Sequence, residues 1–530
     1  MLHNQFLQTH FDPLVLWDDV ANVQTPLPDM PGAVVRVYPA SGAVAMLPLT
    51  PANNYTPTII FCGGTNMTDD QWGNYSYPFI NTWDYPASND CQRITPEPQD
   101  GSAPVYVQDD DMLEGRTMGQ FIILPTGQLL VINGGLNGTA GYATNTLLVA
   151  SLGQMPFGES LASGPVGTPA IYDPNAAPGS RWSNKGLNTS SIARLYHSSA
   201  ILLPDASVLV AGSNPNIDVN TSTIFPTTYQ AEIFYPPYFS ASTRPAPTGM
   251  PTNLTYGGSS FNITIPASSY SGSANDAADS ATCVIHRGGF TTHAMNMGQR
   301  LMQLNNTYTV NADGSIILHV SQPPPNANLF TPGPAFMYVN VLGIPSNGSY
   351  VIVGNGQIGT QPTAPASVLP PSSRLDSASG TASGTNSTGT SSTNNTDLKS
   401  GVKSTVLIGS IVGGVVALAV LGAIIGVFLA RRKRAAGGVT PSADYAMTAG
   451  GATAGAIGSR GMRNSDSSAF VPLQQDNHSN AWNASTTSLN SPYRDDDPSG
   501  RTSMGLSIDR DPYASTPMHP QGYAQEQYRY

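Results

Sequence analysis

The chain has 530 residues, enough for several domains, and only 10% of them are charged. Its 53 glycines and 45 prolines argue against coiled coils and long helical bundles, so strands and loops are expected to dominate. The net charge of -11 excludes the basic surface that DNA and RNA binding require, and no nucleic acid partner is expected.

The first part of the chain repeats a local pattern between residues 31 and 239. Each copy has two apolar runs joined by a proline-containing turn and ends in a glycine pair or Gly-Ser. The three copies are AVAMLPLTPANNYTPTIIFCGG, GQFIILPTGQLLVINGG and HSSAILLPDASVLVAGSN. Repetition at roughly 70 to 80 residues indicates the kelch-like blades of a β-propeller with long loops, so residues 1–240 are expected to form part of a propeller. A β-sandwich is the alternative, although sandwich strands rarely repeat the same turn chemistry.

The predicted fold is all-β, and a second domain follows the propeller part. Short apolar segments over residues 241–358 come at the spacing of an Ig-like β-sandwich. Residues 359–405 are rich in Ser, Thr, Gly and Pro and are expected to form an O-glycosylated stalk without a core.

An uncharged apolar run, Val406 to Ala430, is followed at once by Arg431-Arg432-Lys433-Arg434. At about 1.5 Å per residue such a run spans a hydrocarbon core of ~30 Å, which predicts one transmembrane helix. The positive-inside rule then places residues 431–530, a tail expected to be disordered, in the cytosol. The protein would be a single-pass type I protein of the cell membrane with an extracellular N-terminal part.

N-glycosylation motifs support this orientation. In the part predicted to be extracellular they are Asn54, Asn66, Asn74, Asn137, Asn188, Asn220, Asn253, Asn262, Asn305, Asn347, Asn386 and Asn394. The first twenty residues contain neither the basic region nor the apolar run of a signal peptide. We therefore expect either that the span acts as an internal signal anchor or that the chain is truncated at its N-terminus.

The three cysteines do not describe a disulfide framework. Cys62 and Cys91 lie in one stretch and are expected to pair in an oxidising compartment. Cys283 precedes an apolar strand and is expected to be a buried thiol, or else to have its partner in sequence that is absent here.

Two segments carry residues suited to chemistry, residues 193–216 and residues 286–304. Each histidine alone is most simply a surface or hydrogen-bonded loop residue, but the chain has only 8 of them and Tyr196 directly precedes His197. Neighbouring side chains of a regular strand point to opposite faces. Tyr196 and His197 can therefore serve one centre only where the chain bends, just before the following strand.

The segments LYHSSAILLPDASVLVAGSNPN, EIFYPPYF and GGFTTHAMNMGQR resemble those of the copper radical oxidases, in particular the fungal glyoxal oxidases. The resemblance runs from about residue 31 to residue 353. It implies a seven-bladed propeller that holds copper near its axis, with a histidine inserted by a loop of a galactose-oxidase-like C-terminal domain. Carried over, Tyr196 is the axial phenolate that accepts the substrate proton, His197 is an equatorial ligand, and His293 is the ligand from the second domain. Two imidazoles and a phenolate suit Cu(II).

The resemblance also places His286 outside the ligand set, as a residue at the end of a strand. It further implies a radical cofactor made of a tyrosine cross-linked to a cysteine, and both residues are expected to lie in earlier blades, before residue 31, in sequence that this chain begins too late to contain. Cys62 is a candidate for the cysteine, but a disulfide with Cys91 is favoured. The position two after Arg116, where a tyrosine might stand, is Met118.

The implied reaction is RCHO + H2O + O2 → RCOOH + H2O2, with small aldehydes such as glyoxal and methylglyoxal and O2 as partners of a monomeric protein. Because about half of the expected blades and the radical residues are missing, the chain as given is expected to release no peroxide. The alternative is a catalytically inactive, membrane-anchored protein of the cell surface or wall that derives from this family.

Overall fold

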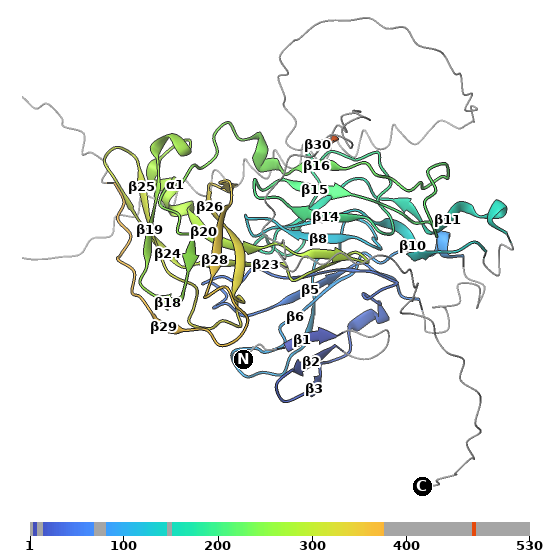
Figure 1. Ribbon diagram of the computed structural model, residues 1–530, viewed down its shortest axis with the longest axis horizontal. Helices are drawn as coiled ribbons and strands as arrows, with labels where there is room; N and C mark the ends of the chain where they lie inside the picture. The colour runs from blue at the N-terminus through green and yellow to red at the C-terminus, as the bar shows by residue number, and fades with distance from the viewer. Residues whose placement is uncertain (1–3, 8–13, 68–80, 146–150, 376–468, 473–530) are drawn as a thin grey trace, which may run out of the picture. The chain divides into compact units, whose positions relative to one another are not determined.

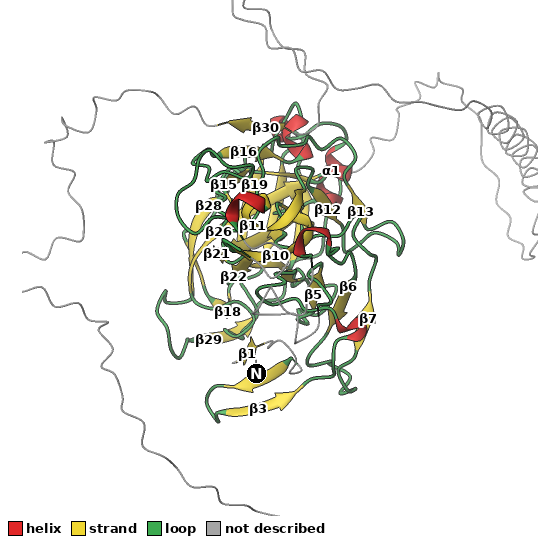
Figure 2. Cartoon of the chain, turned by 90° about the vertical axis from the view of Figure 1, so that its right-hand side faces the viewer, coloured by secondary structure: helices red, strands yellow, loops and turns green. Residues whose placement is uncertain are grey.

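The computed structural model describes residues 4–7, 14–67, 81–145, 151–375 and 469–472. Strands and loops make up most of this part of the chain, as Figure 2 shows, and α1 (Ala274–Ser280) is its α-helix. No helix within these ranges is long and apolar enough to cross a membrane. The predicted span at residues 406–430 lies outside them.

Three four-stranded antiparallel sheets, here named blades 1, 2 and 3, make up most of the first domain. Blade 1 contains β4 (Ala43–Met46), β5 (Ile59–Cys62), β6 (Cys91–Ile94) and β7 (Tyr106–Gln108); blade 2 contains β8 (Gln120–Ile123), β9 (Leu129–Ile132), β12 (Ala170–Tyr172) and β13 (Trp182–Ser183); blade 3 contains β14 (Ser199–Leu202), β15 (Val208–Ala211), β16 (Glu232–Tyr235) and β30 (Ala469–Pro472). The three strand pairs predicted from the repeated pattern are β4/β5, β8/β9 and β14/β15. Every residue of β5, β8 and β9 is buried, which explains their unbroken apolar sequences.

The blades meet through the first strand of each. β8 packs against β14, beside which it lies in Figure 1, and also against β4, as expected for neighbouring propeller blades. The described residues form no closed ring of blades.

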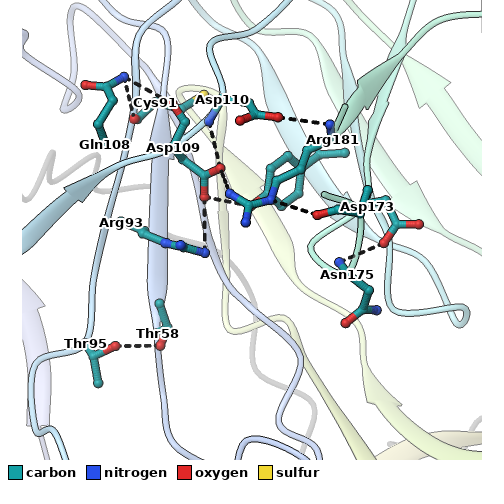
Figure 3. A network of polar contacts seen from close by, with 12 residues as sticks. Thr58, Cys91, Arg93, Thr95, Gln108, Asp109, Asp110, Asp173, Asn175 and Arg181 are labelled. Carbon is teal, nitrogen blue, oxygen red and sulfur yellow. Dashed lines mark hydrogen bonds and ion pairs between the residues drawn. The ribbon is translucent and has the colours of Figure 1, made fainter. Parts of the chain in front are cut away.

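A buried carboxylate links blade 1 to blade 2. The Asp109 carboxylate accepts hydrogen bonds from the Arg181 guanidinium and, at 2.8 Å, from the Tyr172 hydroxyl, and Arg93 lies 3.5 Å away (Figure 3). Burial and the bond to Asp109 raise the pKa of Tyr172 well above its usual value. This network fixes the relative position of the two blades.

Two parts of the first domain were not predicted from the sequence. An N-terminal sheet contains β1 (Asn4–Leu7), β2 (Val15–Asp18) and β3 (Val23–Pro26). A long two-stranded ribbon, β10 (Gly135–Tyr142) and β11 (Pro156–Pro165), is inserted between β9 and β12 of blade 2.

The second domain has two main sheets around one apolar core. The larger sheet has the order β17 (Asn253–Leu254), β28 (Ser349–Val353), β26 (Gly333–Val341), β20 (Thr282–Arg287) and β23 (Arg300–Leu304), with β27 (Ile344–Pro345) paired to β26; the smaller has β19 (Phe261–Ile265), β25 (Ile316–Val320) and β24 (Asn306–Val310). Ile263 and Leu318 of the smaller sheet share a fully buried cluster with Ile285 and Val339 of the larger one. This arrangement is the expected Ig-like sandwich. A hairpin of β21 (Phe290–Thr292) and β22 (Met295–Met297) projects from it.

Two strands fall where sequence analysis predicted none. β29 (Thr363–Ala366), inside the predicted stalk, pairs in parallel with β18 (Tyr256–Gly258), so the second domain extends beyond the predicted boundary at residue 358. β30, inside the predicted disordered tail, pairs with β16. The residues of β29 are all exposed, so this strand leaves no trace in the hydrophobic pattern. The sequence of β30, AFVP, is apolar, but so short a run within a polar segment does not by itself predict a strand.

Candidate metal centre

Tyr196 and His197 lie at the bend that leads into β14. His197 has a φ of 63°, a conformation uncommon for a residue with a side chain. The amide of Ser198 donates to the carbonyl of Leu195 at 3.1 Å and closes the turn. As a result the two neighbouring rings lie on the same side of the chain and stack, with centroids 3.8 Å apart.

The segment after β15 holds this bend in place. The carbonyl of Asn214 is 2.9 Å from Nδ1 of His197, and the amide of Asn214 donates to the carbonyl of Tyr196, also at 2.9 Å. With its Nδ1 atom occupied, His197 can present Nε2 to a metal ion. A Cβ atom at Gly212 would lie 2.6 Å from the carbonyl oxygen of His197, so this position needs glycine.

His293 comes from the second domain, at the tip of the β21/β22 hairpin. Thr292 pairs with Met295, so His293 and Ala294 form a two-residue turn, and both have positive φ (51° and 67°). Such turns normally use Asn and Gly. The use of His and Ala instead stores backbone strain of the kind that is found at functional sites.

The hairpin is docked between the first strands of all three blades. β21 packs against β14, and β22 packs against β4 and β8. Asn296 donates to the carbonyl of Phe121 at 3.1 Å, and Gln299 donates to the same carbonyl at 2.7 Å. The second domain thereby places His293 beside the blade 3 residues.

The three predicted metal ligands are brought together. The ring centroids of His197 and His293 lie 6.1 Å apart, and those of Tyr196 and His293 lie 5.8 Å apart. With metal to nitrogen bonds of about 2 Å, one ion can bind both imidazoles at this separation. Nδ1 of His293 lies 2.7 Å from the hydroxyl of Thr292, which leaves Nε2 available here too.

A fourth aromatic residue, Tyr38, joins the cluster and was not singled out by sequence analysis. Its ring lies edge-on to His293 with centroids 4.9 Å apart, and its centroid is 6.2 Å from that of Tyr196. Tyr38 is 41% exposed, whereas Tyr196 is 6% exposed. The centre therefore combines two imidazoles with two phenols.

An internal repeat could have identified Tyr38. In each blade an arginine lies two residues before the position that faces the centre: Arg36 before Tyr38, Arg116 before Met118 and Arg194 before Tyr196. All three arginines are buried. Their Nη1 atoms donate to equivalent backbone carbonyls, those of Gly63, Asn133 and Gly212. The same anchor thus positions Tyr38, Met118 and Tyr196.

The donor set fits copper. Among the described residues, no three side chains of His, Cys, Asp or Glu gather in a group that could hold a metal ion. A metal at this cluster would need the phenol oxygens as ligands, and imidazole with oxygen donors suits Cu(II).

The cysteines lie elsewhere in the fold. Cys62 and Cys91 pair across β5 and β6 and form a disulfide. Cys283 is buried in the core of the second domain, and burial raises the pKa of its thiol to about 12. None of the three cysteines of the chain is therefore available to modify Tyr38.

His286 does not belong to the cluster. It lies near the end of β20, fully buried, and burial lowers the pKa of its imidazole to about 4. Its Nε2 atom has no hydrogen-bond partner.

Comparison with known proteins identifies both domains. Residues 5–238 match the glyoxal oxidase N-terminus model and residues 244–353 match the galactose oxidase-like early set domain model. The chain is 31% identical over 360 residues to aldehyde oxidase GLOX1 of Arabidopsis thaliana, an alignment that covers 66% of this chain and 52% of that protein. It is 32% identical over 342 residues to aldehyde oxidase GLOX of Vitis pseudoreticulata, covering 64% and 58%, respectively.

Galactose oxidase of Gibberella zeae is 29% identical over 244 residues, covering 45% of this chain and 29% of that protein. A solved structure of a fungal alcohol oxidase of the AA5 family in complex with copper aligns with a TM-score of 0.41 and 16% identity, over 64% of this chain and 70% of that chain. The chain spans about half the length of the curated aldehyde oxidases it matches. Its two matched domains show that the chain belongs to the copper radical oxidase family, which includes the glyoxal oxidases and galactose oxidase.

Proposed function

We propose that the chain provides the copper centre of an oxidase that converts small aldehydes, such as glyoxal and methylglyoxal, to carboxylic acids and reduces O2 to H2O2. The observation that carries this proposal is the convergence of Tyr38, Tyr196, His197 and His293 from blade 1, blade 3 and the second domain. A purely structural role does not explain two histidines held at positive φ with their Nδ1 atoms occupied.

The four side chains have distinct roles in this proposal. His197 and His293 hold the metal through Nε2. Tyr196, which is almost fully buried, accepts the proton of the substrate hydroxyl. A bound copper ion supplies one of the two electron transfers that the oxidation requires, and Tyr38 is the residue of the chain placed to supply the other.

The reaction balances as RCHO + H2O + O2 → RCOOH + H2O2. The hydrated aldehyde loses two electrons and two protons as its C–H hydrogen and one hydroxyl proton leave, and O2 gains both pairs. Tyr196 as the proton acceptor and Tyr38 as the one-electron partner account for the parts that the protein performs.

A second function is favoured by the positions of the cysteines. The family's radical tyrosine is cross-linked to a cysteine, but Cys62 is paired with Cys91, and Cys283 lies in the core of the second domain. The second candidate is therefore a copper-binding but catalytically inactive protein of the cell surface or wall.

Copper binding and peroxide release together test both candidates. Sequence analysis predicted no peroxide release because it named no radical tyrosine; with Tyr38 at the centre, we instead expect the wild-type chain, loaded with Cu(II), to bind one copper ion and to release peroxide from methylglyoxal in a peroxidase-coupled assay. His293→Ala should lose the copper. His319→Ala is the matched control, since His319 lies in β25 bonded to Asn262 and Thr309, and it should retain the copper. Undiminished copper in His293→Ala would refute the metal centre, whereas copper binding without peroxide would favour the inactive protein.

The proposal includes attachment to the cell membrane through residues 406–430, with both domains outside the cell as a monomer. It rests on the apolar run and the Arg-Arg-Lys-Arg cluster that follows it.

A further inference from the structure

The connection between β15 and β16, residues 212–231, is a long loop with exposed apolar side chains. Ile217 is 60% exposed, and Val219 and Ile224 are each 58% exposed. Its one charged residue is Asp218. Exposed apolar residues gathered in one loop are characteristic of a binding surface.

This loop is rigidly connected to the candidate metal centre. Its first residues include Asn214, which bonds both His197 and Tyr196. Near its end, Phe225 is buried in the same apolar cluster as Tyr196. The hydroxyl of Thr227 donates to Oδ1 of Asn214 at 2.8 Å and ties the two ends of the loop together.

The middle of the loop is bonded to the β10/β11 ribbon, whose Tyr142 lies next to Tyr196 of the centre. The amide of Ile217 donates to the carboxylate of Glu159 in β11, and the backbone carbonyl of Glu159 accepts from Ala143 at 2.8 Å. Ala143 follows Tyr142, whose ring centroid lies 6.3 Å from that of Tyr196. Phe157 of the same ribbon stacks on Phe225 with centroids 5.5 Å apart. The segment that carries the exposed Ile217 and Ile224 is thereby connected to the rings of the centre, through Glu159 on one side and through Phe225 on the other.

We propose that this loop is an apolar wall at the mouth of the centre and that it selects aldehydes with an alkyl substituent over small dicarbonyl compounds. The inference rests on the proposed function and narrows its substrate class: glyoxal and methylglyoxal would still be oxidised, but less efficiently than aldehydes that carry an alkyl chain. When an alkyl chain binds along Ile217 and Ile224, the chain and the two exposed side chains are all removed from water, and this burial of apolar surface favours binding. Glyoxal has no such substituent and gains nothing from the wall. The aldehyde carbon is oxidised by the same balanced reaction, with O2 as the oxidant.

The test compares hexanal with glyoxal as substrates and hexanoate with acetate as binding probes. The double variant Ile217→Ser/Ile224→Ser removes the apolar wall. Ile358→Ser is the matched control, since Ile358 is a fully exposed isoleucine in the second domain. Because Asn220 lies in a glycosylation motif of the same loop, all proteins are compared after enzymatic deglycosylation.

We expect the wild type and the control to have a higher kcat/KM for hexanal than for glyoxal. The double variant should lose about tenfold in kcat/KM for hexanal with little change for glyoxal. By isothermal titration calorimetry, hexanoate should bind the wild type more tightly than acetate does, and only the double variant should lose this difference. The calorimetric result does not depend on turnover.

The outcomes separate the two proposals. Selective loss of hexanoate binding without any peroxide release would support the wall and refute the oxidase function. Peroxide release with the same hexanal to glyoxal ratio in the wild type and the double variant would overturn the wall. A dimer in solution that only the double variant fails to form would also overturn it, because the loop would then be an interface between two copies of the chain.

Discussion

At the scale of single residues, the candidate centre depends on side chains held in conformations that the backbone disfavours. His197, His293 and Ala294 all have positive φ, at a cost of the order of 1 kcal/mol or more each. Buried arginines and the docked hairpin stabilise these conformations. These conformations therefore serve to position the side chains of the centre and do not add to the stability of the fold.

Replacement of Tyr38 tests its proposed role as the one-electron partner. Tyr38→Phe keeps the ring and removes the hydroxyl, so we expect one copper ion still to bind through the two histidines and Tyr196. Peroxide release should fall by a factor of about 100 or more, since the second electron transfer is lost. Stoichiometry by metal analysis and the peroxidase-coupled assay measure the two effects separately. Peroxide release within a factor of two of the wild type would exclude Tyr38 from the reaction.

His286 makes stability depend on pH. Its folded pKa is about 4, below the ordinary value of 6.5, because burial disfavours the imidazolium ion. It faces Leu301 and Phe336 on the neighbouring strands, with the backbone of Ile123 as hydrogen-bond partner; the nearest charged residues on these strands are the cationic Arg287 and Arg300.

The unfolded chain therefore binds a proton at His286 below pH 6.5, whereas the folded chain does so only near pH 4. The contribution of His286 to stability should be constant above pH 6.5 and fall by about 3 kcal/mol as the pH drops towards 4. Urea unfolding at pH 7.5 and 4.5 measures this, and His286→Leu should show a smaller pH difference. An equal difference in both proteins would assign the pH dependence to other groups.

The sequence predicted part of the centre and missed part of it for a physical reason. Tyr196, His197 and His293 were found because each lies in a long local motif. Tyr38 precedes Pro39 and an apolar strand without a neighbouring histidine, so only its distance from Arg36 marks it. Its contact with His293 joins two domains, and such long-range contacts leave no local pattern.

At the scale of secondary structure elements, too, the sequence predicts the strands that a local pattern marks and misses those that only long-range pairing defines. The pairs β4/β5, β8/β9 and β14/β15 follow from apolar runs around a turn. The β10/β11 ribbon has the glycine-rich sequence GLNGTAGY in its first strand, which carries no alternating pattern. Its pairing therefore becomes visible only in the structure.

Gly212 follows β15 and lies against the bend at His197. Replacing it, in comparison with a second glycine, distinguishes the backbone strain of positive φ from a steric clash with this bend. Gly212→Ala and Gly179→Ala both place alanine at positive φ, 74° and 82°, and each should cost about 1 kcal/mol of stability. Only at Gly212 would the new Cβ meet the carbonyl of His197, whereas nothing lies within 4 Å at Gly179.

We therefore expect Gly212→Ala to weaken copper binding at least tenfold and Gly179→Ala to leave it unchanged. Competition with a copper chelator measures the affinity, and urea unfolding measures the stability. Equal copper affinities in the two variants would show that the bend at His197 does not depend on close contact with Gly212.

At the scale of the whole molecule, two features of the chain exclude each other. β30 pairs with β16 of blade 3, so residues 469–472 lie on the same side as the first domain. A single span at residues 406–430 would put them on the opposite side of the membrane.

A comparison of free energies favours the membrane span over the pairing of β30 with β16. Each Leu, Ile, Val or Phe at the centre of a membrane helix contributes roughly -0.3 to -0.6 kcal/mol, so the uncharged run as a whole favours insertion by several kcal/mol. A four-residue strand gains about 1 kcal/mol per hydrogen bond and loses ~1–2 kcal/mol per residue in chain entropy, so its net contribution is near zero.

We therefore predict that membrane insertion separates β30 from β16 in cells, with the C-terminus in the cytosol. An antibody to a C-terminal tag should bind only after permeabilisation, and the pair Tyr235→Cys/Ala469→Cys, opposed in the β16/β30 register, should not form a disulfide. Antibody binding to intact cells together with that disulfide would show that the chain does not cross the membrane at residues 406–430 and that the tail completes blade 3.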